Sequence, residues 1–437
     1  MSGSARASAP TAFVNARLID PETRYDGPGC VVVSKGVIAD VQRQPRLEIG
    51  SSGLKVVDCA GAMLAPGLID LRVKTGEPGA EPKETLKSAS RAAAAGGVTS
   101  IVVQPDTSPP IDEPAMVDFV LRRARDIELV HVYPAGAATR GIKGERMAEI
   151  GLMRDAGAVY FTDVDHPIVN SKVLRRVMSY ADAFGAFVAH RPADAWLSEG
   201  ACATEGELAA RLGLPAAPAI AERIMLERDL ALAELTGARL LCDQISTADA
   251  LESLRRARDK GLRVKASCSI NHLMFNELDI GDYRTFYRLD PPLRSEQDRL
   301  ALIDALSEGL IDMVVSAHAP APAEDKRLPY AEAAPGAVGL ETLLPALLAL
   351  HHDAGLPLLR LISAVTLGPA ELLGLRAGRI APGAPADLVL ADINAPVVVD
   401  PARLFSKSKN SPFGGRRLQG QVLMTMVDGR VVHQCAQ

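Results

Sequence analysis

The segment Leu-Ala-Pro-Gly-Leu-Ile-Asp-Leu-Arg-Val-Lys, residues 64–74, joins an apolar run to two basic side chains. Its first eight residues, 64–71, are mostly apolar, a composition typical of a strand that is buried on both faces. Arg72 and Lys74 follow at the end of that strand. The segment therefore predicts a buried strand that carries two cationic groups at its carboxyl end.

Seven further runs of this kind follow, each separated from the next by a longer helical stretch rich in Ala, Leu, Glu and Arg. The eight predicted strands are residues 64–71, 98–103, 128–133, 158–162, 186–189, 238–243, 263–268 and 311–316. Helices are predicted at 88–95 and 143–155, because Gly96-Gly97 and Gly157 follow them as stop signals. This α/β alternation over about 310 residues fits a (β/α)8 TIM-like barrel at residues 65–376.

The two ends of the chain have a different pattern. Short strands with turn signals such as Asp428-Gly429 are predicted at residues 12–20, 30–41, 56–63, 386–391 and 421–432. We expect these strands to pair across the termini, so that residues 1–64 and 377–437 form one small β-sandwich domain.

Composition narrows the class of protein. The formal charge is −5 with no long run of either sign, which argues against nucleic acid or a membrane as the partner. Six scattered cysteines without a C-x-x-C pair are typical of reduced thiols. The first ten residues lack the apolar stretch of a secretory signal, so we expect a cytoplasmic protein.

Several motifs occur in a fixed order along the chain. They are Ala-Ala-Ala-Ala-Gly-Gly-Val-Thr at 92–99, Pro-Asp-Thr-Ser-Pro-Pro at 105–110, Asn-His-Leu at 271–273, Pro-Pro-Leu-Arg at 291–294, Ala-His-Ala-Pro at 317–320, Pro-Gly-Ala-Val-Gly-Leu-Glu-Thr at 335–342 and Ser-Lys-Ser-Lys-Asn at 406–410. With these motifs the chain resembles bacterial dihydroorotases of the amidohydrolase superfamily along nearly its whole length. The resemblance implies a barrel with a terminal β-domain and a zinc site at the strand ends.

The resemblance also places the six metal ligands of that family on this sequence, and five of them are changed. The changed positions are Arg72, Lys74, Val164, Gln244 and Ala317, and the retained histidine is His190. An Arg is never deprotonated in a protein and a Lys ammonium has no lone pair, so neither replaces a histidine on zinc. The sequence therefore predicts no metal, no cofactor and no catalytic residue at these positions.

Substrate contacts are changed as well. Gly76 stands where the family has an Arg for the substrate carboxylate, and Asp106 stands where it has an Asn. We expect the cations either to enter an internal ion-pair network with Asp70, Asp163, Asp243 and Glu77 or to form an anion pocket. The anion pocket would consist of Arg72, Lys74, His190 and His318.

These observations predict a catalytically inactive dihydroorotase-like protein of pyrimidine biosynthesis, a pseudoenzyme. The resemblance implies a structural or assembly role with aspartate transcarbamoylase, or association with further copies of the chain. One alternative is an active cyclic-amide hydrolase, of dihydroorotase, hydantoinase or allantoinase type, with an atypical zinc site. The other is a metal-free regulatory protein that binds an anion.

Overall fold

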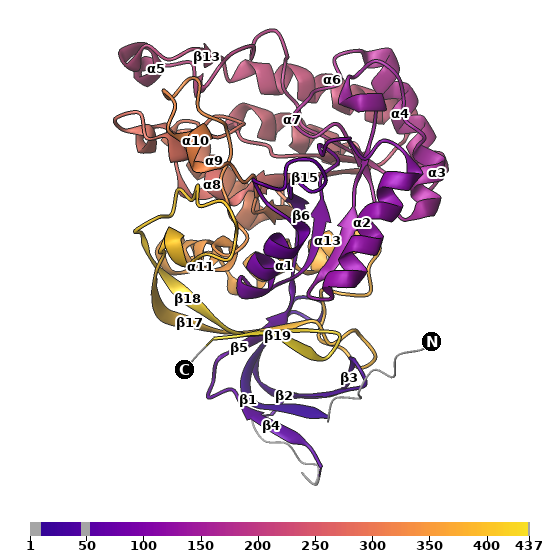
Figure 1. The fold of residues 1–437 in the computed structure, drawn as a ribbon, viewed down its shortest axis with the longest axis vertical. Helices are drawn as coiled ribbons and strands as arrows, with labels where there is room; N and C mark the ends of the chain where they lie inside the picture. Colours follow the sequence, from indigo (N-terminus) through magenta and orange to yellow (C-terminus); the bar gives the residue numbers. More distant parts are fainter. Residues whose placement is uncertain (1–9, 45–52, 436–437) are drawn as a thin grey trace.

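The structure is a computed structural model that describes residues 10–44 and 53–435. A barrel of alternating strands and helices stands on a mixed β-sheet made from both ends of the chain (Figure 1). The predicted fold class, an α/β protein with a (β/α)8 barrel and a small domain from both termini, is confirmed, but the terminal strands form one mixed sheet where a β-sandwich was expected. Within the described ranges, no helix has both the length and the apolar character that crossing a membrane requires.

The barrel wall consists of parallel strands. Its strands in chain order are β6 (Leu68–Val73), β7 (Val98–Val103), β8 (His131–Pro134) continued by β9 (Gly136–Ala137), β10 (Phe161–Thr162), β11 (Val188–His190), β14 (Leu240–Cys242), β15 (Val264–Ser269) and β16 (Met313–Val315). A parallel bridge between Val73 and His318 brings the last strand beside the first. Each of the eight predicted strands overlaps one of these, because apolar and β-branched runs such as Val98–Val103 are buried along their whole length.

Helices cover the outside of the barrel. They are α1 (Leu86–Ala95), α2 (Pro114–Ile127), α3 (Ile150–Ala156), α4 (Ser171–Ala183), α5 (Glu207–Leu212), α6 (Ile220–Thr236), α7 (Ala248–Asp259), α8 (Ile270–Met274), α9 (Glu296–Glu308), α10 (Ala323–Lys326), α11 (Leu343–Ala354), α12 (Leu358–Val365) and α13 (Leu367–Leu373). The prediction of a helix from residue 143 is wrong, since α3 begins only at Ile150. Gly144 takes a left-handed backbone conformation inside the predicted range, which interrupts a helix there.

Apolar side chains fill the inside of the barrel. Tyr160 and Phe187 stack there with ring centroids 5.2 Å apart, beside Leu71, Val102 and Leu241. The Tyr160 hydroxyl donates to the carbonyl oxygen of Leu71 at 2.5 Å. The barrel is therefore a packed core, and an open space can form only at its ends.

The terminal strands form one mixed sheet of eight strands. They are β1 (Thr11–Asp20), β2 (Tyr25–Ser34), β3 (Val37–Gln42), β4 (Lys55–Asp58), β5 (Met63–Pro66), β17 (Leu388–Val398), β18 (Arg417–Val427) and β19 (Arg430–Gln434). The Asp428-Gly429 turn joins β18 to β19 as predicted. The sheet lies against the barrel at α1, where the Thr425 hydroxyl donates to the carbonyl oxygen of Ala94 at 2.6 Å.

Candidate functional site

Arg72 lies at the carboxyl end of β6 and is buried among acceptors. Its side chain is 4% exposed, and its Nη1 and Nη2 pair with the carboxylates of Asp243 and Asp165. With its amide oxygen turned toward Arg72, Gln244 accepts from Nε at 2.8 Å and from Nη2 at 3.1 Å. All three nitrogens of this guanidinium are thereby engaged, so Arg72 is an anchor for three chain segments.

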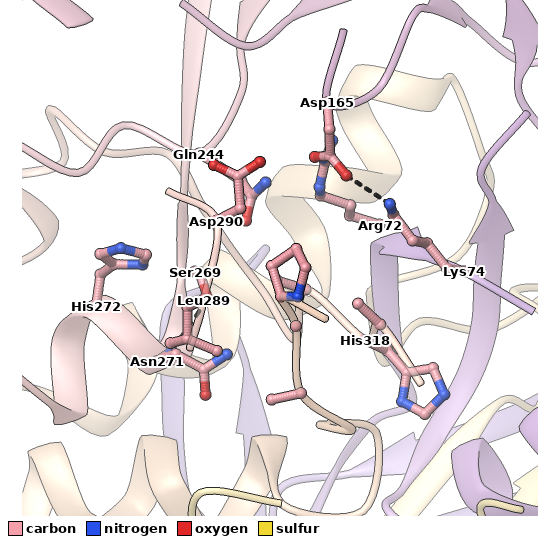
Figure 2. A pocket seen from close by; sticks show the side chains of 15 residues that line it. Arg72, Lys74, Asp165, Gln244, Ser269, Asn271, His272, Leu289, Asp290 and His318 are labelled. Carbon is pink, nitrogen blue, oxygen red and sulfur yellow. Dashed lines mark hydrogen bonds and ion pairs between the residues drawn. The ribbon is translucent and has the colours of Figure 1, made fainter. Parts of the chain in front are cut away.

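Lys74 continues the network toward the opening of the barrel. Its Nζ lies 2.7 Å from Asp106. It also lies 2.5 Å from Asp165, and Figure 2 draws this second ion pair. Arg191 joins this network through Asp165 and Asp290. Its Nη1 donates to the carboxylate of Asp290 and its Nη2 donates to the backbone carbonyl oxygen of Asp165, each at 2.8 Å. Ion pairs thus join the carboxyl ends of several strands, which is where barrel enzymes place their active residues.

The network fixes the charge state of its members. Burial opposes the charge of Lys74, but Asp106 and Asp165 outweigh burial and raise the pKa of Lys74 above its usual range. Burial likewise opposes ionisation of Asp165, yet Lys74 and Arg72 hold its pKa well below the ordinary value. Lys74 therefore stays an ammonium and Asp165 a carboxylate at neutral pH.

The ion pairs differ from those predicted. Asp165 was not foreseen, and it takes the place expected for Asp163, whose carboxylate instead accepts from the backbone N–H of Thr139 at 2.9 Å and from the Thr139 hydroxyl. Asp70 accepts from the backbone N–H groups of Arg72 and Ser316, and Glu77 pairs with Arg123. Asp243 is the predicted partner that does bind Arg72.

Three of the changed ligand positions share an unusual backbone. Val164, Gln244 and Ala317 have φ values of 56°, 53° and 51°, in the left-handed region that residues other than glycine adopt uncommonly. Such conformations cost about 1–3 kcal/mol and cluster at functional sites. The chain thus keeps a strained backbone frame at these positions although their side chains are not metal ligands.

His190 and His318, the two histidines kept from the family pattern, make hydrogen bonds with neighbouring side chains and backbone groups. His190 Nδ1 lies 2.6 Å from Asp229, and His190 Nε2 accepts from the N–H of Ile168, so this histidine is buried and does not line the pocket described below. His318 Nδ1 accepts from the N–H of Gly339 at 3.2 Å. Its Nε2 lies 3.5 Å from Glu84, which is too long for a good hydrogen bond.

A small pocket opens beside the network. It has a volume of about 50 Å³ and is lined by Arg72, Lys74, Asp165, Gln244, Ser269, Asn271, His272, Leu289, Asp290, Ala317, His318, Ala319, Pro335, Gly336 and Ala337. Figure 2 shows the ion pairs on one side of this pocket and His272 with Asn271 on the other. A second cavity of about 270 Å³ adjoins it, since both share Asp165, Asp290 and Pro335.

Two buried side chains of the pocket carry acceptor atoms without a partner among the described residues. They are Asn271 Oδ1 and His272 Nδ1. His272 Nε2 lies 3.3 Å from the carbonyl oxygen of Pro292, which leaves the lone pair on Nδ1. Burial and the neighbouring Arg294 lower the pKa of His272 to about 4, so its ring is neutral at pH 7. These atoms can accept hydrogen bonds from a bound molecule.

Gly76 has a structural reason to be glycine in this chain. Its φ is +68°, and a Cβ at this position would lie 2.6 Å from the carbonyl oxygen of Ala80. Any side chain here would strain the loop, so the Arg that the family uses for a carboxylate has no place in this backbone.

The residues at this end of the barrel do not fit a zinc ion. Two of the six positions hold cations that are already paired, and Val164 and Ala317 have no donor atom. Elsewhere in the described chain, one group of three side chains has metal-ligand spacing, namely His131, Asp387 and Asp428. That group lies where the start of β8 meets the terminal sheet, away from the pocket.

A barrel with a terminal β-sheet and a polar pocket at its strand ends is typical of the amidohydrolases. Residues 61–250 match the family described as Dihydro-orotase-like, and residues 202–432 match the Amidohydrolase family. Dihydroorotases of Anaplasma phagocytophilum and Anaeromyxobacter dehalogenans are 40% and 41% identical over 97% and 96% of this chain, and 95% and 96% of their own. The chain belongs to the dihydroorotase family of the amidohydrolase superfamily.

Solved structures with a similar fold support this assignment. The L-hydantoinase (dihydropyrimidinase) of Arthrobacter aurescens superposes with a TM-score of 0.86 at 26% identity, over 98% of this chain and 96% of its own. A dihydropyrimidinase of Brevibacillus agri has a TM-score of 0.84 at 20% identity, over 97% and 95%, and supports the fold alone.

These comparisons overturn the expectation of an inactive protein. Relatives at about 40% identity over nearly the full length are named dihydroorotase, and a similar solved structure is a hydantoinase, which favours an active cyclic amidohydrolase. The prediction counted metal ligands, and such a count does not test whether other side chains support a reaction.

The expectation that no cofactor is needed is overturned by the same findings, because dihydroorotases and hydantoinases are typically zinc enzymes. The donor set of this pocket nevertheless does not match zinc.

Proposed function

We propose that this chain hydrolyses a cyclic amide of the dihydroorotate or hydantoin class, or closes that ring in reverse, in the pocket at the carboxyl ends of the barrel strands. The observation that carries the proposal is the pocket's arrangement of donors and acceptors. Lys74 offers one N–H group on one side, and Asn271 and His272 offer free acceptors on the other. A cyclic amide or ureide presents a carbonyl oxygen that complements Lys74 and a ring N–H that complements Asn271, which leaves the lone pair of His272 for the attacking water.

The ring needs more room than the 50 Å³ pocket provides. The adjoining cavity of about 270 Å³ supplies that room across their common boundary at Asp165 and Asp290. In this placement the carbonyl to be attacked faces Lys74 and the rest of the ring extends toward Arg191. The site therefore suits a small polar ring with one charged or polar substituent.

Lys74 would polarise the carbonyl. Two of its three ammonium protons are directed to Asp106 and Asp165, and the third remains for a substrate oxygen. Its raised pKa keeps the ammonium charged, which makes Lys74 a hydrogen-bond donor and excludes a nucleophilic amine at neutral pH. His272, whose Nδ1 has no partner and whose ring is neutral at pH 7, would accept a proton from the attacking water and return it to the ring nitrogen as the C–N bond breaks.

The test is a ring-opening assay with dihydroorotate, hydantoin and allantoin, with zinc supplied, and the reverse reaction with carbamoyl aspartate. K74M and N271A should each lower kcat/KM at least a hundredfold. The matched control K172Q changes an exposed lysine on α4 and should leave the rate within twofold. Full activity in K74M would overturn the assignment of Lys74.

Two expectations remain predictions from the resemblance. They are the association with aspartate transcarbamoylase or with further copies of this chain, and the cytoplasmic location. Co-purification from native lysate and size-exclusion chromatography with light scattering address the first of these directly.

A further inference from the structure

A further cavity lies at the opposite end of the barrel from the candidate active site. It has a volume of about 690 Å³ and opens where β14, β15 and β16 begin, at Leu240, Val264 and Met313. This volume falls in the range of small-molecule sites, about 300–1,000 Å³. Nothing in the proposed reaction uses this cavity.

Basic side chains dominate the lining of this cavity. They are Arg239, Arg258, Arg263, Lys265 and Arg360, against the two carboxylates of Asp312 and Glu371. One of these carboxylates is shared, because Asp312 pairs with Arg258 and lies 2.9 Å from Lys265. The cavity wall therefore carries an excess of positive charge.

Two of the guanidinium groups have no carboxylate partner within the described chain. Arg239 donates to the carbonyl oxygen of Gly185 and lies over the ring of Phe187. Arg360 donates to the carbonyl oxygens of Leu306, at 2.7 Å, and Ile311. Burial lowers the pKa of Arg360, which is the direction expected for a cation whose charge is incompletely compensated.

These carbonyl contacts also hold the cations in place. Arg258 donates to the carbonyl oxygen of Gly309, which follows α9, and Arg360 binds carbonyls near the same helix end. Helix ends of this kind attract cations, so the contacts alone explain why one or two arginines are here. Of the five basic groups, Arg263 also pairs with Asp182, and Arg258 and Lys265 share one carboxylate. Positive charge therefore still exceeds negative charge around the cavity. An arginine held in a fixed orientation loses less entropy when it binds an anion.

We propose that this basic cavity binds an organic polyphosphate of nucleotide size. Guanidinium groups bind phosphate oxygens in pairs, and several cations around one cavity suit a ligand with several negative charges. The remaining wall includes Leu262, Val264 and Leu372, which can contact the apolar face of a base. The site is distinct from the active-site pocket, and its test is independent of turnover.

The test is isothermal titration calorimetry of the full-length protein with adenosine triphosphate, inorganic tripolyphosphate and adenosine, at low salt and without magnesium. We expect adenosine triphosphate to bind more tightly than tripolyphosphate, and adenosine not to bind. The variant R239Q/K265Q should weaken adenosine triphosphate at least tenfold. The matched control K172Q/R175Q removes two exposed charges from α4 and should stay within twofold.

Absence of heat with adenosine triphosphate would overturn the proposal, as would equal weakening in the two double variants. Adenosine binding as tightly as its triphosphate would also overturn it, because the cations would then contribute nothing. Should R239Q/K265Q fail to fold, R263Q/K265Q makes the same change in charge on two side chains that are each more than half exposed.

Discussion

The substitution Asp243→Asn tests the buried ion pair at the centre of the site. Asp243 pairs with Arg72, and the two side chains are 6% and 4% exposed. The other carboxylate oxygen of Asp243 accepts from the Ser267 hydroxyl at 2.7 Å. Asparagine has nearly the same shape, so the change removes the charge with little change in packing.

The expected loss in the free energy of unfolding depends on the partners that Arg72 keeps in D243N. Removing one member of a buried ion pair typically costs about 3–5 kcal/mol, because the other charge stays buried without compensation. Arg72 keeps Asp165 and Gln244 as partners, which places the expected loss at the lower end, about 3 kcal/mol. An exposed ion pair typically contributes only about 0–1 kcal/mol.

Urea denaturation at pH 7 measures this difference. The matched control is Glu234→Gln, which removes the acidic member of the exposed pair with Lys260, where the side chains are 52% and 59% exposed. We expect D243N to lower the free energy of unfolding by about 3 kcal/mol and E234Q by less than about 1 kcal/mol. A loss in D243N no larger than that in E234Q would refute the argument that Arg72 depends on its carboxylates.

Three further predictions follow from the site and its surroundings. Ala317→Asn should raise the free energy of unfolding by about 1 kcal/mol in urea denaturation, because Asn tolerates the left-handed backbone at φ 51°. The control Ala319→Asn changes an ordinary backbone position of the same pocket and should give no gain in stability. Burial opposes protonation of His131, but its hydrogen bond to Asp387 outweighs burial and raises the pKa of His131 in the folded protein. The stabilisation by this histidine is therefore complete below about pH 6.5 and is lost as the pH rises through the pKa of the folded state. The difference in free energy of unfolding between the unsubstituted chain and H131Q should accordingly be larger at pH 5.5 than at pH 9. Turnover should fall as the pH drops through about 4, where His272 becomes protonated, and a pH–rate profile that instead falls near pH 7 would exclude His272 as the proton acceptor.

Much of the fold could be predicted from local sequence. Runs such as Val98–Val103 are β-branched and apolar, and burial on both faces of a parallel strand is the environment that such runs fit. The start of α3 could not be predicted in this way, because Gly144 imposes a left-handed turn that outweighs the helix-forming residues around it.

The site was predicted in part. Its positions followed from the order of the motifs, and Asp243 was correctly expected as a partner of Arg72. Asp165 was missed because the left-handed conformation of Val164 changes the direction of the chain between Asp163 and Asp165. No pattern of residue types shows a positive φ at a valine, so the sequence alone favoured the wrong aspartate.

The prediction of inactivity failed for a different reason. It rested on the absence of zinc ligands, whereas the pocket also contains an ammonium with a free proton and two acceptors without partners. These features depend on which atoms remain unpaired after folding, and that information exists only in the structure.

Ring opening of dihydroorotate by the purified full-length protein, followed by loss of substrate absorbance with zinc supplied, tests the central claim most directly. The account predicts turnover that K74M and N271A reduce at least a hundredfold and that K172Q preserves. Absence of turnover with dihydroorotate, and equally with hydantoin, in the unsubstituted protein would contradict it.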